Sequence, residues 1–158
     1  MPWFLCTAAI MLLQHGVDPK WYKIGDVLHQ LQEHFRFYRF FHGDYNCIEE
    51  ETFLTTFLAA GYDLTVSDMN CCKEYFDRSN TDIFKIMHDY SRPSSLKHLV
   101  RAKIRNHIRS VNMDTSVFPV IDKLTLPTIL QDFLKLYDVS PSDMTSMICY
   151  KDSPINRH

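Results

Sequence analysis

Apolar residues recur at helical spacing in several parts of the chain, most clearly in "RPSSLKHLVRAKIRNHI", residues 92–108. Spacings of three and four residues place side chains on one face of an α-helix. The apolar stripe of this segment consists of Leu96, Leu99, Val100, Ile104 and Ile108. The other face is basic and carries Lys97, Arg101, Lys103 and Arg105. The pattern predicts an amphipathic helix and raises the question of what its apolar stripe packs against.

A second apolar helix is predicted in "LTLPTILQDFLKLYD", which begins at residue 124. Pro127 fits the first turn of a helix, where its missing N–H costs no hydrogen bond, and Thr125 can serve as the cap. The apolar positions that follow are Leu130, Phe133, Leu134 and Tyr137. Residues 110–123, "SVNMDTSVFPVIDK", are predicted to be a connector. The expected unit is therefore a helix, a loop and a second helix, with an apolar stripe on each helix.

Two segments near the N-terminus end in the same way. In "TAAIMLLQHGVDP" and "TFLTTFLAAGYDL" an apolar helical run is followed by a glycine, at Gly16 and Gly61, and by an aspartate two residues later. Glycine is favoured at this position because the residue after a helix often adopts a left-handed conformation. In the first segment Pro19 also bars continuation of the helix. The two endings superimpose and indicate a weak internal repeat.

Two further regions also read as helical. "IGDVLHQLQEHFRFYRFFHGD" predicts a helix with Asp26 near its start and Gly43 near its end. Its aromatic residues, interleaved with Arg36 and Arg39, resemble a nucleic-acid platform, but a packed helix with core aromatics is favoured because no lysine-rich flank supports the alternative. The apolar positions proposed for this helix are Val27, Leu28, Leu31, Phe35, Tyr38 and either Phe41 or Phe40.

Residues 70–90, "NCCKEYFDRSNTDIFKIMHDY", predict two short helices separated at "DRSN". The core candidates of the second piece are Ile83, Phe84, Ile86 and Met87. Pro93 then disfavours helix at the residue before it, and Ser94 or Ser95 can cap the next helix. A boundary is therefore expected near residue 91.

Composition narrows the class of protein. The chain has 158 residues, of which 46% are apolar and 23% charged, as in a soluble globular protein. Its net charge of -2 gives the whole molecule no electrostatic reason to bind nucleic acid or an acidic membrane. The apolar run near the N-terminus is too short to span a bilayer and lacks the basic leader of a signal peptide. We therefore expect a cytoplasmic or nuclear protein.

Candidate chemistry is sparse. The five cysteines form no C-x-x-C unit, and adjacent Cys71 and Cys72 are interpreted as reduced cysteines in a helical segment. His42 lies close to Asp44, but no nucleophile stands in a recognisable turn such as Gly-x-Ser-x-Gly. An enzyme that uses these residues is the least favoured hypothesis. We expect no catalytic residue, no bound metal and no cofactor.

The repeated endings resemble the second helix and turn of an ankyrin repeat, which reads much like Val-x-x-Leu-Leu-x-x-Gly-Ala-Asp-Pro. The first copy matches it at Ile10, Leu12, Leu13, Gly16, Asp18 and Pro19. The second matches only at core positions, and the separation of 45 residues exceeds the repeat length of about 33. The resemblance implies degenerate ankyrin-like helical hairpins. Because repeat arrays need about three or more units, a further expectation is that the chain belongs to a longer array, as a fragment or short isoform.

The C-terminal helix pair resembles the SOCS box. Its elongin-binding box typically reads Ser-Leu-x-x-x-Cys-x-x-x-aliphatic and corresponds to residues 95–104, and its cullin box typically reads Leu-Pro-x-Pro-x-x-Leu and corresponds to residues 124–134. Val100 stands in place of the cysteine and Thr125 in place of the first proline. Both halves occur in order and a loop apart, which is far more specific than either alone. Together with the ankyrin-like endings, they resemble the ankyrin repeat and SOCS box family.

The resemblance implies partners and sites. Elongin B and elongin C would bind through Leu96, Leu99, Val100 and Ile104. A cullin–RING scaffold would bind through Leu124, Leu126, Pro127 and Leu130. The implied role is a non-catalytic adaptor that brings an unidentified protein to a ubiquitin ligase. Val100 is expected to weaken rather than abolish elongin docking, and loss of the first proline is expected to remove rigidity before the second helix.

Two other interpretations stay open at this point. The box could be silent, which would leave an ankyrin-type interaction protein, or both apolar stripes could pack internally and need no partner. The predicted fold is all-α in either case. It comprises an ankyrin-like helical region over residues 1–90, a SOCS box over residues 91–137 and a flexible tail over residues 138–158.

Overall fold

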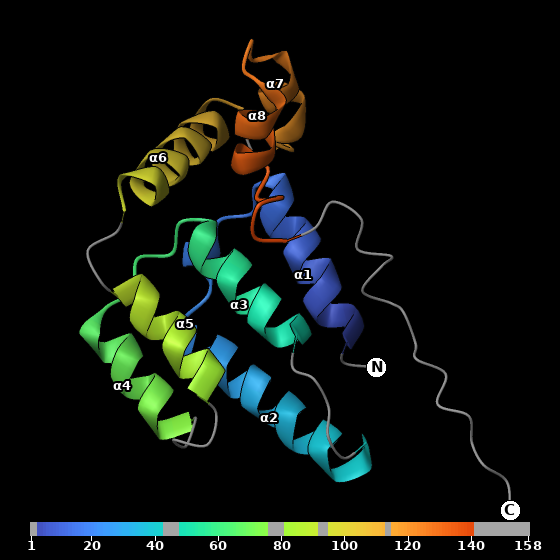
Figure 1. Ribbon diagram of the computed structural model, residues 1–158, viewed down its shortest axis with the longest axis vertical. Helices are drawn as coiled ribbons and strands as arrows, with labels where there is room; N and C mark the ends of the chain where they lie inside the picture. Colours follow the sequence, from blue (N-terminus) through green and yellow to red (C-terminus); the bar gives the residue numbers. More distant parts are fainter. Residues whose placement is uncertain (1–2, 43–47, 76–80, 92–94, 113–114, 141–158) are drawn as a thin grey trace, which may run out of the picture.

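The computed structural model describes residues 3–42, 48–75, 81–91, 95–112 and 115–140. Within these residues the chain is all-helical and contains no strand, which confirms the predicted fold class (Figure 1). The helices are α1 (Trp3–His15), the short 3-10 helix η1 (Pro19–Trp21), α2 (Ile24–His42), α3 (Ile48–Ala59), α4 (Val66–Tyr75), α5 (Thr81–Ser91), α6 (Leu96–Val111), α7 (Phe118–Lys123) and α8 (Thr128–Leu134).

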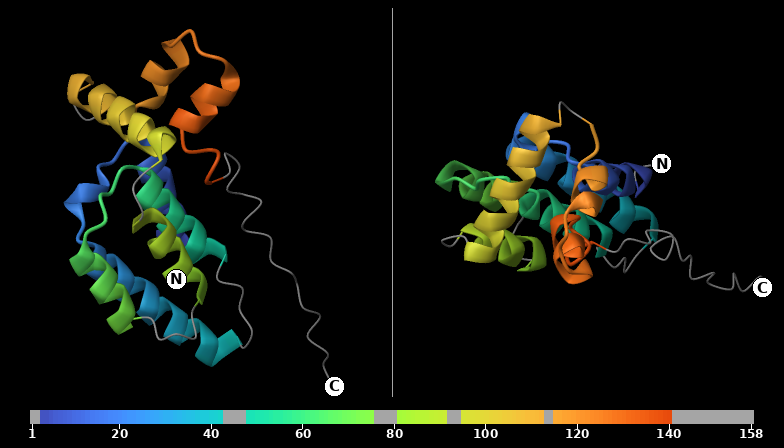
Figure 2. Two further views of the ribbon diagram at one scale, coloured as in Figure 1. Left: turned by 60° about the vertical axis from the view of Figure 1, so that its left-hand side comes forward. Right: turned by 90° about the horizontal axis from the view of Figure 1, so that it is seen from above.

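The first five helices form two rows. Helix α3 packs between α1 and α5, while α2 packs against α4 (Figures 1 and 2). One hydrophobic core joins both rows, because each helix buries one apolar face between them. Its fully buried members include Leu28, Leu54, Leu58, Ile83 and Met87. The break predicted between residues 75 and 81 separates α4 from α5, and the predicted core residues Phe84 and Ile86 pack against this core in part.

The two repeated glycines end their helices as the sequence predicts. Gly16 has a φ of +111° and Gly61 a φ of +113°, conformations that side chains other than glycine rarely adopt. The Gly16 N–H donates to the carbonyl of Leu13 at 3.1 Å, and the Val17 N–H donates to that of Leu12 at 3.0 Å. This pair of bonds is the Schellman motif, which satisfies the carbonyls of Leu12 and Leu13 near the end of α1.

The same glycines also let the C-terminal helices approach closely. A Cβ atom built on Gly16 would lie 2.6 Å from Cγ1 of Val117, and one built on Gly61 would lie 3.3 Å from Cβ of Ala102. In addition, the Val117 N–H donates to the carbonyl of His15 at 3.0 Å. The segment α6–α8 therefore sits across the carboxyl ends of α1 and α3 (Figure 1).

A second, smaller core lies within α6–α8 and consists of Ile108, Val117, Ile121 and Leu134. Leu136 connects it to the first core, since it follows α8 in sequence yet is fully buried among the residues of α1–α5. Leu136 has a φ of +68°, which is unfavourable for a leucine. Its N–H and that of Tyr137 bond to the carbonyls of Phe133 and Asp132, in the Schellman pattern again. Burial of the leucine side chain offsets the backbone strain.

Three details of the C-terminal region differ from the sequence prediction. The predicted connector contains α7, because Val117 and Ile121 bury themselves one turn apart; six residues are too few for periodicity to reveal a helix. Helix α8 begins at Thr128 with Pro127 as its N-cap residue, so Thr125 is not the cap. Ser140, which the sequence prediction placed in a flexible tail, is buried, and its hydroxyl accepts a hydrogen bond from the Gln14 amide at 2.9 Å. Residues 141–158 lie outside the described residues.

Helix α1 exposes part of its apolar surface. Met11 and Leu12 are 47% and 54% exposed, whereas the residues at the same places before Gly61 on α3, Thr56 and Phe57, are buried. The difference arises because α3 has a helix on each side in its row. The side chains of Trp3 and Phe4 lie outside the described residues. In the part of the chain that the structure describes, none of the helices has the length and apolar character to cross a membrane.

The structure describes some of the residues considered as candidates for redox, catalytic or metal chemistry. Cys71 and Cys72 are free cysteines on α4, as predicted, and burial raises the pKa of the Cys72 thiol to about 11. A buried thiol of this kind is unreactive at neutral pH. The side chain of His42, with Asp44 and the aromatic residues at 35, 38, 40 and 41, lies outside the described residues. Among described side chains, no group of three or more His, Cys, Asp or Glu could hold a metal ion.

Replacing Gly16 tests the contact between the two cores. Gly16→Ala should lower the free energy of unfolding by about 2 to 3 kcal/mol, because alanine is strained at this φ and its Cβ would overlap Val117. Gly25→Ala is the matched control: Gly25 lies within α2, where an added Cβ would meet only the Cys71 sulfur at 4.0 Å. Alanine there should be neutral or stabilising by up to about 1 kcal/mol. Urea unfolding measures both variants, and equal stabilities would contradict the close approach.

Candidate functional site

Helix α6 begins as the sequence predicts. Ser95 is its N-cap residue, and the Ser95 hydroxyl accepts a hydrogen bond from the His98 N–H at 3.2 Å. This bond satisfies one of the four N–H groups that a helix start leaves without a partner. The helix then runs for 16 residues to Val111 and includes the whole predicted apolar stripe.

The stripe does not pack against the body of the protein along its whole length. Leu96 is 76% exposed, Leu99 52% and Val100 42%. Further along the helix, Ile104 is half-buried and Ile108 is buried, both against the second core. The first two turns of α6 therefore present three apolar side chains to solvent, and the last two turns close the core of the C-terminal segment.

Arginines hold the opposite face of α6 against the body. Arg101 and Arg105 are buried, to 5% and 0% exposed, and Arg109 is half-buried. These residues are spaced by four, so they lie on one face of the helix. The sequence pattern placed two of them on the polar face, where a basic helix would normally be solvated. The structure instead turns that face inward and leaves the start of the apolar stripe outside.

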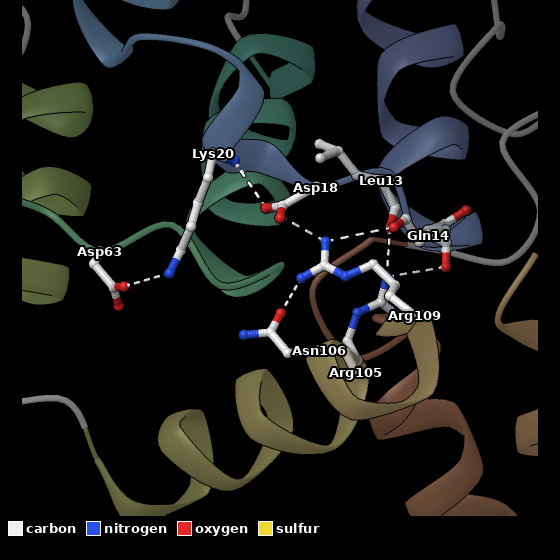
Figure 3. A network of polar contacts seen from close by, with 9 residues as sticks. Leu13, Gln14, Asp18, Lys20, Asp63, Arg105, Asn106 and Arg109 are labelled. Carbon is white, nitrogen blue, oxygen red and sulfur yellow. Dashed lines mark hydrogen bonds and ion pairs between the residues drawn. The ribbon is translucent and has the colours of Figure 1, made fainter. Parts of the chain in front are cut away.

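Arg105 bridges two helices with its guanidinium. Its Nη1 donates to the carbonyl of Leu134 at the end of α8. Its Nη2 donates to the carbonyls of Leu13 and Gln14 at the end of α1, the latter at 3.1 Å (Figure 3). The last carbonyls of a helix lack partners within it and carry the negative end of the helix dipole. A guanidinium placed there supplies several donors and a complementary charge at once.

Burial of the Arg105 guanidinium removes it from water, which is unfavourable for a charged group. Burial lowers the pKa of the Arg105 guanidinium to about 9, and the positive charges of Arg109 and Arg101 act in the same direction. The group nevertheless stays charged at neutral pH. No carboxylate pairs with it among the described contacts, and its Nε atom has no hydrogen-bond partner. Charge-assisted bonds to carbonyls therefore carry the interaction, at about 1.5 to 3 kcal/mol each.

Arg101 and Arg109 extend the same face in both directions. Arg101 donates to the Asp138 carboxylate at 2.8 Å and lies 4.0 Å above the ring of Phe133. Burial lowers the pKa of the Arg101 guanidinium, while Asp138 opposes that shift. Arg109 lies 3.5 Å from the Asp18 carboxylate and bonds to Asn106 on its own helix (Figure 3). The three arginines thus fix α6 to the turn after α1 and to the segment after α8.

The second predicted site, around α8, is only partly exposed. Pro127 is exposed and Leu130 is 45% exposed, whereas Leu124 and Leu126 are half-buried against the second core. Ile129, at 76%, is the most exposed apolar residue of this helix, although it was not among the predicted site residues. The two sites together therefore expose Leu96, Leu99 and Val100 on α6 and Pro127, Ile129 and Leu130 on α8.

Two functional features escaped the sequence interpretation. The buried arginines left one usable signal: α6 carries arginines at intervals of four and no acidic residue that could neutralise them on the same helix. Gln131, which holds the loop before α8, left no signal, because its acceptors are main-chain carbonyls of Leu124 and Leu126.

Residues 92–135 match the family model of the SOCS box. The chain contains a SOCS box. The match begins directly after α5 and does not include the two-row body, so the ankyrin resemblance of residues 1–90 stays a prediction. Comparison with curated proteins found no match to the chain, and comparison with solved structures found none.

A SOCS box generally implies elongin B, elongin C and a cullin–RING scaffold as partners. Proteins that carry one are typically non-catalytic adaptors of E3 ubiquitin ligases. In this chain the matched residues include α6, α7 and α8.

Replacing Arg105 tests the anchoring of the SOCS box. Arg105→Met should lower the free energy of unfolding by about 2 to 4 kcal/mol, because carbonyls of Leu134 and Gln14 lose their donor in a buried site. Lys103→Met, on the exposed side of α6, should change it by no more than about 0.5 kcal/mol. Thermal and urea unfolding compare the two variants. An Arg105→Met protein as stable as the native chain would mean that the desolvation cost of the charge cancels its hydrogen bonds.

Proposed function

We propose that the protein is a substrate-recognition adaptor of an elongin B/C–cullin–RING E3 ubiquitin ligase. Its SOCS box would bind elongin B and elongin C through α6 and the cullin through α8. The two-row helical body would hold the protein to be ubiquitinated. The adaptor would contribute proximity rather than bond chemistry, since a bound target experiences a high effective concentration of the ubiquitin-carrying enzyme. This role implies action in the cytoplasm or the nucleus.

The observation that carries the proposal is the exposure of Leu96, Leu99 and Val100 within the SOCS box. A leucine that is 76% exposed leaves most of its apolar surface in water, and its full burial in a partner would contribute about 1.5 to 3 kcal/mol. A few such anchors typically dominate a protein–protein interface. Val100 keeps an apolar side chain on this surface where the elongin-binding box usually has cysteine, so the face stays continuous.

The buried arginines explain why the apolar residues stay available. Rotation of α6 about its axis would let Leu96 and Leu99 pack against the body, but it would pull Arg101 and Arg105 away from their acceptors. Buried carbonyls and a buried guanidinium would then lack partners, at several kcal/mol. The interpretation in which the whole stripe packs internally is therefore wrong for the first two turns of α6.

Support for cullin recruitment is more limited and comes from α8. Pro127, Ile129 and Leu130 are exposed there, next to the half-buried Leu124 and Leu126. The half-buried pair would act by shaping the loop rather than by full insertion into a partner. Since α8 also contacts α6, the elongin and cullin surfaces would have a fixed relation to each other.

Co-expression with elongin B and elongin C, followed by affinity capture, tests the elongin half of the proposal. Leu96→Glu should abolish capture, because a carboxylate would have to enter an apolar pocket without a partner. Val66→Glu is the matched control: Val66 is 80% exposed on α4, outside the SOCS box, and should be captured like the native chain.

Equal capture of Leu96→Glu and the native chain would contradict the assigned surface. Failure of the native chain itself to capture the elongins would favour the alternative function, a non-catalytic interaction domain with a silent SOCS box. In that case the departures from the motif at Val100 and Thr125 would account for the lack of binding. Circular dichroism of both glutamate variants would verify that each is folded.

A further inference from the structure

The loop between α7 and α8 is held by one side chain. The Nε2 amide of Gln131 donates to the carbonyl of Leu124 at 3.1 Å and to the carbonyl of Leu126 at 3.3 Å. Both N–H groups of the amide are therefore used, one on each side of Thr125. The Leu126 N–H also donates to the carbonyl of Leu124 at 2.8 Å, which closes a tight turn around Thr125.

This turn decides how the residues before α8 are presented. Leu124 and Leu126 lie half-buried against the second core, while Pro127 is exposed at the start of α8. A loop with no such clamp would sample other backbone conformations, and each would change the position of Pro127 relative to Ile129 and Leu130. Ordering the loop before a partner arrives removes that entropy cost from binding.

The backbone around Thr125 already has a geometry that a proline would accept. Leu124 has φ −70° and ψ 132°, close to the polyproline II conformation, which a following proline tolerates. Among the described hydrogen bonds, none uses the Thr125 N–H as donor, and the residue is exposed. Proline at this position would thus restrict the loop without removing a hydrogen bond.

We infer that Gln131 is a positioning residue for cullin docking. It holds the turn around Thr125 by two side-chain hydrogen bonds, in the way that a proline ring would hold it by a fixed φ. This inference rests on the proposed function of α8 as a cullin-binding helix. It adds a residue that acts through the loop backbone and leaves the exposed residues of α6 unaffected.

Binding of a purified cullin–RING scaffold to the full chain co-expressed with elongin B and elongin C tests the inference. Gln131→Met removes both donors at nearly constant side-chain length and should weaken cullin binding by roughly tenfold, as expected for lost preorganisation. Capture of elongin B and elongin C should stay within about twofold of native, because α6 keeps its anchors. The double variant Thr125→Pro, Gln131→Met should bind the cullin as the native chain does.

The rescue separates positioning from general destabilisation. Proline at residue 125 cannot replace a lost packing contact of Gln131, but it can restore a lost backbone restraint. Hydrogen exchange gives a second readout that needs no cullin: the amides of Leu124 and Leu126, which donate to the carbonyls of Ile121 and Leu124, should exchange faster in Gln131→Met. They should return towards native rates in the double variant.

Four results would overturn the inference. Native-like cullin binding by Gln131→Met would show that the clamp is dispensable, and persistent loss in the double variant would show that the backbone restraint is not what matters. A native chain that captures the elongins but no cullin would remove the inference together with the cullin half of the proposed function. A native chain that captures neither would instead remove the proposed function as a whole.

Discussion

The arrangement of the molecule depends on a single buried guanidinium. Arg105 reaches the final carbonyls of α1, which belongs to the helical body, and the final carbonyl of α8, which belongs to the SOCS box. Helix ends buried without donors are unfavourable, and a charged group buried without acceptors is more so. Here the guanidinium donates to the carbonyls at the helix ends, so both groups gain hydrogen-bond partners. These hydrogen bonds explain why α1, α6 and α8 meet at Arg105.

The other contacts between body and SOCS box reinforce the same geometry. Leu136 accepts a left-handed backbone in order to place its side chain in the core of α1–α5. Gln14 bonds to Ser140, and the two glycines leave room for Val117 and Ala102. Apolar, polar and steric contacts thus act at one junction. The helical body and the SOCS box are therefore held in one fixed relation to each other.

Much of the fold follows from local pattern. Periodic apolar positions predicted the helices around Leu13, Leu58, Met87 and Ile108, and the positive-φ turns at the two repeated glycines were predicted because few other residues accept them. Leu136 shows the limit of this reasoning. A leucine gives no local indication of positive φ, and only a distant core makes it favourable there. Helix α7 escaped prediction because one turn is shorter than the pattern that would reveal it.

The candidate site was proposed from its resemblance to a motif, because helical periodicity alone could not predict which residues of α6 are exposed. Periodicity identifies residues that share a face of α6, yet it does not say which face meets the body. Carbonyls about ninety residues earlier in the chain decide that choice, by accepting bonds from Arg105. The same reasoning applies to Gln131, whose partners are main-chain atoms that carry no sequence signal. Sequence reasoning succeeds where the determinants are neighbours and fails where a distant backbone atom is the partner.

The shared guanidinium also bears on how freely this SOCS box can be exchanged between proteins. A box transplanted onto another helical body would bring Arg105 without the carboxyl end of α1 that receives it. The recipient would need a helix ending at the same place, followed by a glycine that admits Val117 as Gly16 does. A functional chimera would therefore need the residues of the body that contact the SOCS box, in addition to the box itself.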